Sequence, residues 1–121
     1  MRVGYVVLYV TDHDACLKFW TEQVGMVKKG SKQAGTFEIA EVGFADQQFS
    51  FQLVPLALMA DNPHNLDLAT PSIAFGNQNL EAAREKLIAA GVQTSEIGDQ
   101  GGTMSFAFSD NEGRWFAVTE G

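Results

Sequence analysis

The order of apolar and polar positions repeats once along the chain. An apolar run from Val3 to Val10 leads into a polar break and then into a helical pattern that closes at Gly25. From Ser72 the same order returns, and its helical pattern closes at Gly91. The two stretches have nearly the same length. This repetition predicts a duplicated structural unit, because each stretch reads as a strand, a helix cap and a helix.

Two amphipathic helices are predicted, from Asp14 to Val24 and from Leu80 to Ala90. The apolar residues of each helix follow helical spacing and form one stripe; these are Cys16, Phe19, Trp20 and Val24 in the first helix, and Leu80, Ala83, Leu87 and Ile88 in the second. Asp12 and Asn79 suit the N-cap positions. Gly25 and Gly91 suit the left-handed position that follows many helices.

Alternating or continuous apolar runs predict the strands, which are Val3–Val10, Thr36–Phe44, Phe49–Val54, Ile73–Phe75, Thr103–Ser109 and Arg114–Thr119. The polar stretch 27–35 is expected to be a solvated hairpin or strand edge, and Gly98–Gly102 a flexible loop. These elements predict an α+β fold of two tandem βαβββ modules, at about 1–55 and 72–121. The linker 56–71 contains the apolar Leu56–Met59, which could cover a cleft.

Size and charge narrow the possible functions. A chain of 121 residues with 45% hydrophobic residues has enough apolar material for one domain over 1–121. Lys and Arg number 8 against 15 Asp and Glu, which gives a net charge of −7. This acidic balance argues against nucleic acid and anionic membranes as partners, because both require a basic surface.

The chain lacks the marks of export and of several common catalytic sites. Its single cysteine, Cys16, excludes an internal disulfide and is expected to be buried. No apolar run is long enough for a membrane helix and no signal-peptide pattern opens the chain, so a cytoplasmic protein is expected. The chain also has no Gly-x-Ser-x-Gly, P-loop or Gly-x-Gly-x-x-Gly motif. His13 and His64 are expected to be solvated, and Glu38 and Glu41 to lie on opposite faces of one strand.

The motifs in this order resemble those of the vicinal oxygen chelate superfamily. They are Asp12 at the helix start, Phe19-Trp20-Thr21-Glu22 and Val24-Gly25-Met26 at the helix end, and Asp110 to Gly113 before the last strand. That superfamily includes glyoxalase I, bleomycin-resistance proteins and extradiol dioxygenases. The resemblance extends from Met1 to Glu120 and implies two βαβββ modules with curled mixed sheets around a cleft.

The resemblance also implies where a metal would bind. Metal-using members take one ligand from the first and one from the last strand of each module, and these places fall on Tyr5, Gln52, Ser72 and Ala117. A phenol, an amide, a hydroxyl and a methyl do not form the usual set of imidazole and carboxylate ligands. We therefore expect no metal and no cofactor at this site. Glu38, Glu41 or Glu120 could contribute to a shifted site, although Glu120 would face the other way from Ala117.

The metal-free branch of the superfamily resembles bleomycin-binding proteins, which are acidic dimers that sequester a ligand unchanged. It implies a homodimer and a small organic ligand, cationic or neutral and partly aromatic, bound without catalysis. Side-chain alternation adds Val7, Ser50, Val54, Ala74, Trp115 and Thr119 to the face of Tyr5, Gln52, Ser72 and Ala117. Three alternatives stay open. The cleft could be filled by its own side chains, the protein could be a metal-dependent lyase or dioxygenase with unusual ligands, or it could be a sensing or partner-binding module.

Overall fold

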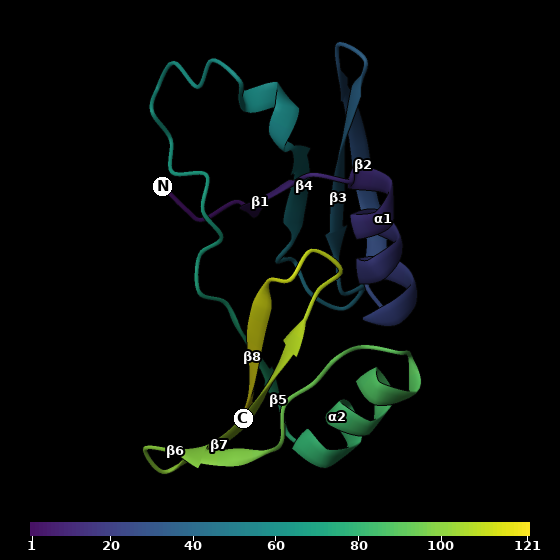
Figure 1. Ribbon diagram of the computed structural model, residues 1–121, viewed down its shortest axis with the longest axis vertical. Coiled ribbons are helices and arrows are strands. Elements are labelled where there is room, and N and C mark those ends of the chain that lie inside the picture. Colours follow the sequence, from purple (N-terminus) through teal and green to yellow (C-terminus); the bar gives the residue numbers. More distant parts are fainter. The chain divides into compact units, whose positions relative to one another are not determined.

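The chain is built from two compact units, residues 1–70 and residues 71–121. The computed structural model describes residues 1–99 and 101–121, together with the backbone of residue 100. Each unit contains one mixed sheet of four strands, and neither sheet closes into a barrel (Figure 1). The predicted α+β class with two βαβββ modules is confirmed.

The first unit contains four strands and three helical segments. In chain order they are β1 (Val6–Val10), α1 (His13–Lys18), a π-helical turn (Phe19–Gln23), β2 (Val27–Ala34), β3 (Phe37–Gly43), β4 (Phe51–Pro55) and a 3₁₀ helix (Leu56–Met59). The strand order is β1-β4-β3-β2. Only β1 and β4 are parallel, and α1 lies in the long connection that a parallel pair requires.

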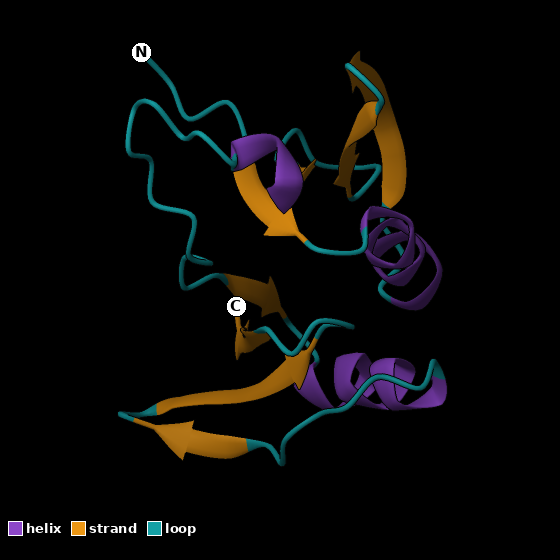
Figure 2. Cartoon of the chain, turned by 45° about the horizontal axis from the view of Figure 1, so that its top comes forward, coloured by secondary structure: helices purple, strands orange, loops and turns teal.

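The second unit repeats this arrangement on a smaller scale. Its elements are β5 (Ala74–Asn77), α2 (Leu80–Ala89), β6 (Gly98–Gln100), β7 (Thr103–Ser109) and β8 (Trp115–Glu120). The strand order is β5-β8-β7-β6, and β5 and β8 form the parallel pair. Figure 2 shows α2 in the connection between β5 and the β6–β7 hairpin.

Each unit has a core between its sheet and its helix. In the first unit the Trp20 ring is fully buried and makes edge contacts with Phe19 and Phe51, each at a centroid distance of 5.2 Å. In the second unit Phe108 and Phe116 stack at 5.6 Å. Aromatic pairs of this kind add to the free energy gained from burial alone. Cys16 is buried in the first core, as predicted.

The first helix has the predicted N-cap but begins at His13, one residue before the predicted start, and continues with a change of geometry. Asp12 is the N-cap, and its side chain accepts the Ala15 amide at 3.1 Å. After Lys18 the helix widens to π geometry, and the Val24 amide bonds the Phe19 carbonyl. The hydroxyl of Thr21 donates to the Leu17 carbonyl at 2.7 Å, an interaction that often bends helices. Gly25 follows with φ 97°, as predicted for the position after the helix.

Three local predictions were wrong. The segment 98–102 was expected to be a flexible loop, but 98–100 form β6, paired with β7 across a turn at Gly101 and Gly102. Both turn residues have positive φ, which matches the tight hairpin turn that glycine pairs favour. Ile88, assigned to the buried stripe, is 47% exposed, because α2 packs on its sheet mainly through Leu80 and Leu87. The first strand begins at Val6, since residues before it have no ladder partner, and Val3 is 80% exposed.

Candidate functional site

The face of the first sheet that points away from α1 carries several of the predicted site residues. Along the ladder, Val7 on β1 lies opposite Gln52 on β4, which lies opposite Glu41 on β3. Alternation places the next row, with Leu8 and Leu53, on the helix side, where it is buried. Val54 is on the same face as Gln52. We call this surface, formed by Val7, Glu41, Gln52 and Val54, the open face of the first sheet.

Tyr5 and Ser50 lie at the start of this face, just before β1 and β4. Tyr5 is 45% exposed, whereas Ser50 is 3% exposed and its carbonyl accepts the Val6 amide at 3.1 Å. The Ser50 hydroxyl donates to Glu41 Oε2 at 2.9 Å. On β1, the ladder neighbour of Gln52 is Val7, and Tyr5 lies two residues before Val7.

The second sheet presents a similar face opposite α2. Ala74 pairs with Ala117, which pairs with Ala107, and Gly76, Thr119 and Ser105 form the next row on the same side. Trp115 begins β8 on this face and is 50% exposed. Ser72 is exposed and lies before β5, two residues before Ala74. We call the surface formed by Ala74, Trp115, Ala117 and Thr119 the open face of the second sheet.

The donor set on these faces does not fit the divalent metal of the metal-using members. Where the first and last strands of each unit pair, the side chains are those of Val7 and Gln52 in the first unit and of Ala74 and Ala117 in the second. Among these four paired side chains the only metal-binding donor is the amide oxygen of Gln52. Transition-metal sites in proteins rely on imidazole, thiolate and carboxylate, so these positions support no metal-driven reaction step.

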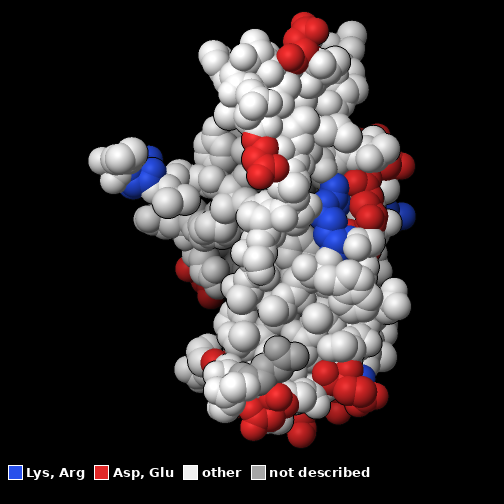
Figure 3. Space-filling view, turned by 60° about the vertical axis from the view of Figure 1, so that its left-hand side comes forward, with Lys and Arg blue, Asp and Glu red and all other residues white. Residues whose placement is uncertain are grey.

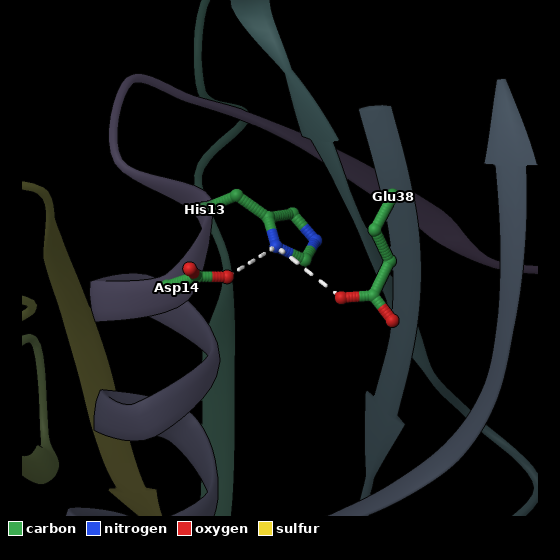
Figure 4. Close-up of side chains that lie close together, drawn as sticks. All are labelled: His13, Asp14 and Glu38. Carbon is green, nitrogen blue, oxygen red and sulfur yellow. Dashed lines mark ion pairs between the residues drawn. The ribbon is translucent and has the colours of Figure 1, made fainter. Parts of the chain in front are cut away.

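Another cluster, on the helix side of the first sheet, was not predicted. Asp14 and His13 at the start of α1 meet Glu38 of β3 (Figure 4). His13 Nδ1 lies 3.6 Å from Asp14 Oδ1 and 3.8 Å from Glu38 Oε1. The expectation that His13 is solvated was wrong, because its side chain is only 11% exposed and its buried Nε2 has no hydrogen-bond partner among the described residues. The sequence marks a capping turn but does not show that β3 packs beside it.

The charges around Glu38 make this cluster an ion-pair group and a poor cation site. Lys28 Nζ donates to Glu38 Oε2 at 2.8 Å and Ser31 Oγ donates to the same oxygen at 2.5 Å. These two hydrogen bonds, with the charges of Lys28 and His13, lower the pKa of Glu38. An ammonium group this close already balances the carboxylate and would repel a divalent ion.

The turn before the last strand is held by a buried ion pair. Asp110 has a fully buried side chain, and Arg114 Nη1 donates to its Oδ2 at 2.8 Å. Arg114 Nη2 also donates to Glu112 at 2.8 Å. Burial lowers the pKa of the Arg114 guanidinium, but the bonds and charges of Asp110 and Glu112 outweigh this, so the pKa is raised. The network fixes the residue directly before Trp115, which helps to orient the open face of the second sheet.

The surface charge is consistent with the acidic composition. Acidic side chains are scattered over the face shown in Figure 3, and the basic ones there form no continuous stripe. Within the described residues, every helix is too short or too polar to cross a bilayer.

Comparison with known proteins places the fold. A structure from Sphaerobacter thermophilus DSM 20745, a member of the glyoxalase/bleomycin resistance protein/dioxygenase superfamily, matches with a TM-score of 0.83 at 20% identity, covering 100% of this chain and 98% of that one. UcmS2 matches with a TM-score of 0.81 at 22% identity over 98% and 97% of the two chains. TnmS3, an antibiotic binding protein from Streptomyces sp. CB03234, matches with a TM-score of 0.80 at 16% identity over 99% and 95%.

Sequence comparison identifies the family directly. Comparison with curated proteins gives no match. The sequence pattern of the glyoxalase-like domain, however, matches residues 5–119, which is nearly the whole chain and includes both βαβββ units. Because sequence pattern and strand order agree over the same residues, the chain belongs to the glyoxalase-like domain family.

Proposed function

We propose that the chain is a metal-independent binding protein for a small organic molecule that is cationic or neutral and partly aromatic. The observation that carries this proposal is the composition of the two open faces. Where the first and last strands of each unit pair, the faces present aliphatic and amide side chains in place of the ligand set of metal-using members, with hydroxyl and aromatic side chains and the carboxylate of Glu41 nearby. Small-molecule sites are commonly apolar with a few polar groups that fix orientation.

A solved relative supports this class of function. TnmS3 has the same fold and is an antibiotic binding protein. At 16% identity the likeness concerns the fold, so the ligand class proposed for this chain rests on its own residues. We propose sequestration of a drug or metabolite, in which the ligand leaves unchanged.

Each unit offers one exposed aromatic residue as the proposed contact for an aromatic ligand on its own sheet. Trp115 is 50% exposed at the start of β8, and Tyr5 is 45% exposed before β1. Stacking on such a ring contributes roughly 0.5–1.5 kcal/mol beyond the burial of area, and a cation over its face contributes about as much. Gln52, with its amide on the open face of the first sheet, is proposed to orient a polar group.

The test is a thermal-shift and fluorescence screen of aromatic antibiotics and metabolites. Trp20 is fully buried while Trp115 is half exposed, so quenching by a ligand at the open face of the second sheet should report mainly on Trp115. A ligand on the open face of the first sheet should raise the melting temperature of the wild type and lose most of this shift in Gln52→Ala, whereas a ligand on the open face of the second sheet should lose it in Trp115→Ala. Ile88→Ala, which removes an exposed apolar side chain of the same unit, is the matched control. A ligand whose shift is unchanged in both variants binds elsewhere and contradicts the proposal.

We further propose that the protein acts as a homodimer, as the resemblance to bleomycin-resistance proteins implies. Light scattering or sedimentation at micromolar concentration should give twice the mass of one chain. A folded monomer under those conditions would remove the dimer from the proposal and leave ligand binding to be tested separately.

A further inference from the structure

The open face of the first sheet carries one carboxylate, that of Glu41, which forms no ion pair with any of the described residues. Glu41 lies opposite Gln52 in the ladder and is partly buried. Its Oε2 accepts the hydroxyl of Ser50, which is 3% exposed. A partly desolvated carboxylate without a positive charge beside it costs free energy, so it favours binding a cation.

The neighbouring strand leaves this carboxylate uncovered. Gly30 of β2 is the register partner of Glu41, and a Cβ placed on it would lie 3.7 Å from Glu41 Oε1. The glycine therefore puts no side chain beside that oxygen. A Cβ at this position would make an ordinary van der Waals contact with the oxygen and cover part of it on the β2 side.

The two lysines before Gly30 are both occupied elsewhere. Lys28 donates to Glu38, whose side chain lies on the helix side of the sheet. Lys29 donates to the Gln47 carbonyl in the turn between β3 and β4. The register shift between Lys28 and Gly30 accompanies this arrangement, since such irregularities redirect side chains. Neither ammonium group forms an ion pair with Glu41.

We propose that Glu41, oriented by Ser50, is the anchor for an ammonium or guanidinium group of the ligand. This inference rests on the proposed function and names its cationic part. One carboxylate oxygen is fixed by Ser50, and the other is available to accept charge-assisted hydrogen bonds. The Gln52 amide lies beside it, and Val7 lies two strands away, about 10 Å for strands spaced ~4.8 Å apart. A cationic group on Glu41 would thus place the rest of the ligand along Gln52 and Val7.

The test compares three forms of one aromatic fragment that differ only in charge. Naphthylmethylammonium, naphthylmethanol and naphthoate are titrated into ¹⁵N-labelled full-length protein, and amide shifts are followed by NMR. The ammonium form should bind at least about tenfold more tightly than the alcohol, because hydrogen bonds to charged groups contribute more than neutral ones. Its shifts should be centred on Glu41, Ser50 and Gln52, and raising the ionic strength should reduce its advantage. Naphthoate should bind most weakly.

Two variants separate the role of Glu41 from that of the overall negative charge of the protein. Glu41→Gln keeps an acceptor for Ser50 and should lower ammonium binding to the level of the alcohol. Glu38→Gln removes the same charge from the same strand on the opposite face and should keep the ammonium preference. Thermal unfolding confirms that each variant is folded, and the comparison of fragments on the wild type needs no variant.

The outcomes distinguish the failure of the Glu41 anchor from the failure of the proposed small-molecule binding. Equal binding of ammonium and alcohol to the wild type, or an ammonium preference that survives Glu41→Gln, would overturn the anchor while leaving aromatic ligand binding intact. The absence of shifts on the open face with all three fragments would overturn both.

Discussion

Glu38 and Glu41 are only three residues apart in β3, yet they differ in environment because successive side chains of a strand point to opposite faces. Glu38 turns to the helix side, where Lys28, Ser31 and His13 surround it. Glu41 turns to the open face, where it accepts the Ser50 hydroxyl and forms no ion pair with the described residues. The first carboxylate is thus part of the fold's own ion pairing, while the second is available for a ligand.

The lowered pKa of Glu38 predicts how its contribution to stability depends on pH. A carboxyl group whose folded pKa is depressed stabilises the protein above its ordinary pKa of 4.5 and loses that contribution as pH falls through the folded value. Glu38→Gln should therefore be less stable than the wild type at pH 6–7, and the difference should shrink below roughly pH 4.5. Urea unfolding at several pH values measures this.

Glu22→Gln provides the control for Glu38, since Glu22 is exposed. Its free energy of unfolding should follow the wild type across the same range. A Glu38→Gln difference that is independent of pH, or that grows in acid, would show that the hydrogen bonds from Lys28 and Ser31 do not depend on the ionised carboxylate.

Among the elements, the β6–β7 hairpin depends most directly on backbone conformation. Its turn residues Gly101 and Gly102 have φ of 63° and 88°, and the Gly102 amide donates to Asp99 Oδ1 at 2.8 Å. Residues with a Cβ rarely adopt such φ values. The hairpin should therefore tolerate side chains along its strands but not at its turn.

Gly102→Ala should lower the free energy of unfolding by about 1 kcal/mol. Gly98→Ala is the matched control, because Gly98 is in β6 without positive φ and a Cβ there would meet no atom within 4 Å. It should be neutral or slightly stabilising. Urea unfolding of both variants tests the prediction, and equal effects would mean that strand propensity, rather than turn conformation, limits this hairpin.

Elements with a periodic pattern and a cap were predictable from the sequence, and those defined by contacts with other segments were not. The caps Asp12 and Asn79 and the strand Thr103–Ser109 follow from residue type and alternation. The π-helical turn is closed by a bond from the Val24 amide to the Phe19 carbonyl, and β6 depends on pairing across two glycines. The burial of His13 depends on β3 packing against a capping turn, which no local pattern records.

At the scale of the whole molecule, the duplicated βαβββ order could be predicted because the same order of apolar run, polar break and helical pattern occurs twice in the sequence. In both units the partner of the predicted last-strand residue lies two residues after the predicted first-strand residue. Gln52 pairs with Val7, two residues after Tyr5, and Ala117 pairs with Ala74, two residues after Ser72. Alternation preserves the face under a shift of two, so the predicted site residues within each strand still share one side of their sheet.

The paired positions carry Val7 and Gln52 in the first unit and Ala74 and Ala117 in the second, which predicts that the protein binds no metal there. Protein purified without an affinity tag should contain far less than one equivalent of nickel, zinc, iron or manganese by elemental analysis. Neither chelator nor added metal should change its melting temperature, because a ligand that binds only the folded state would raise it. If a stoichiometric metal is found, Gln52→Ala and His13→Gln locate it. Loss of the metal in Gln52→Ala would contradict a metal-independent open face, whereas loss only in His13→Gln would assign the metal to the helix-side cluster with Asp14 and Glu38.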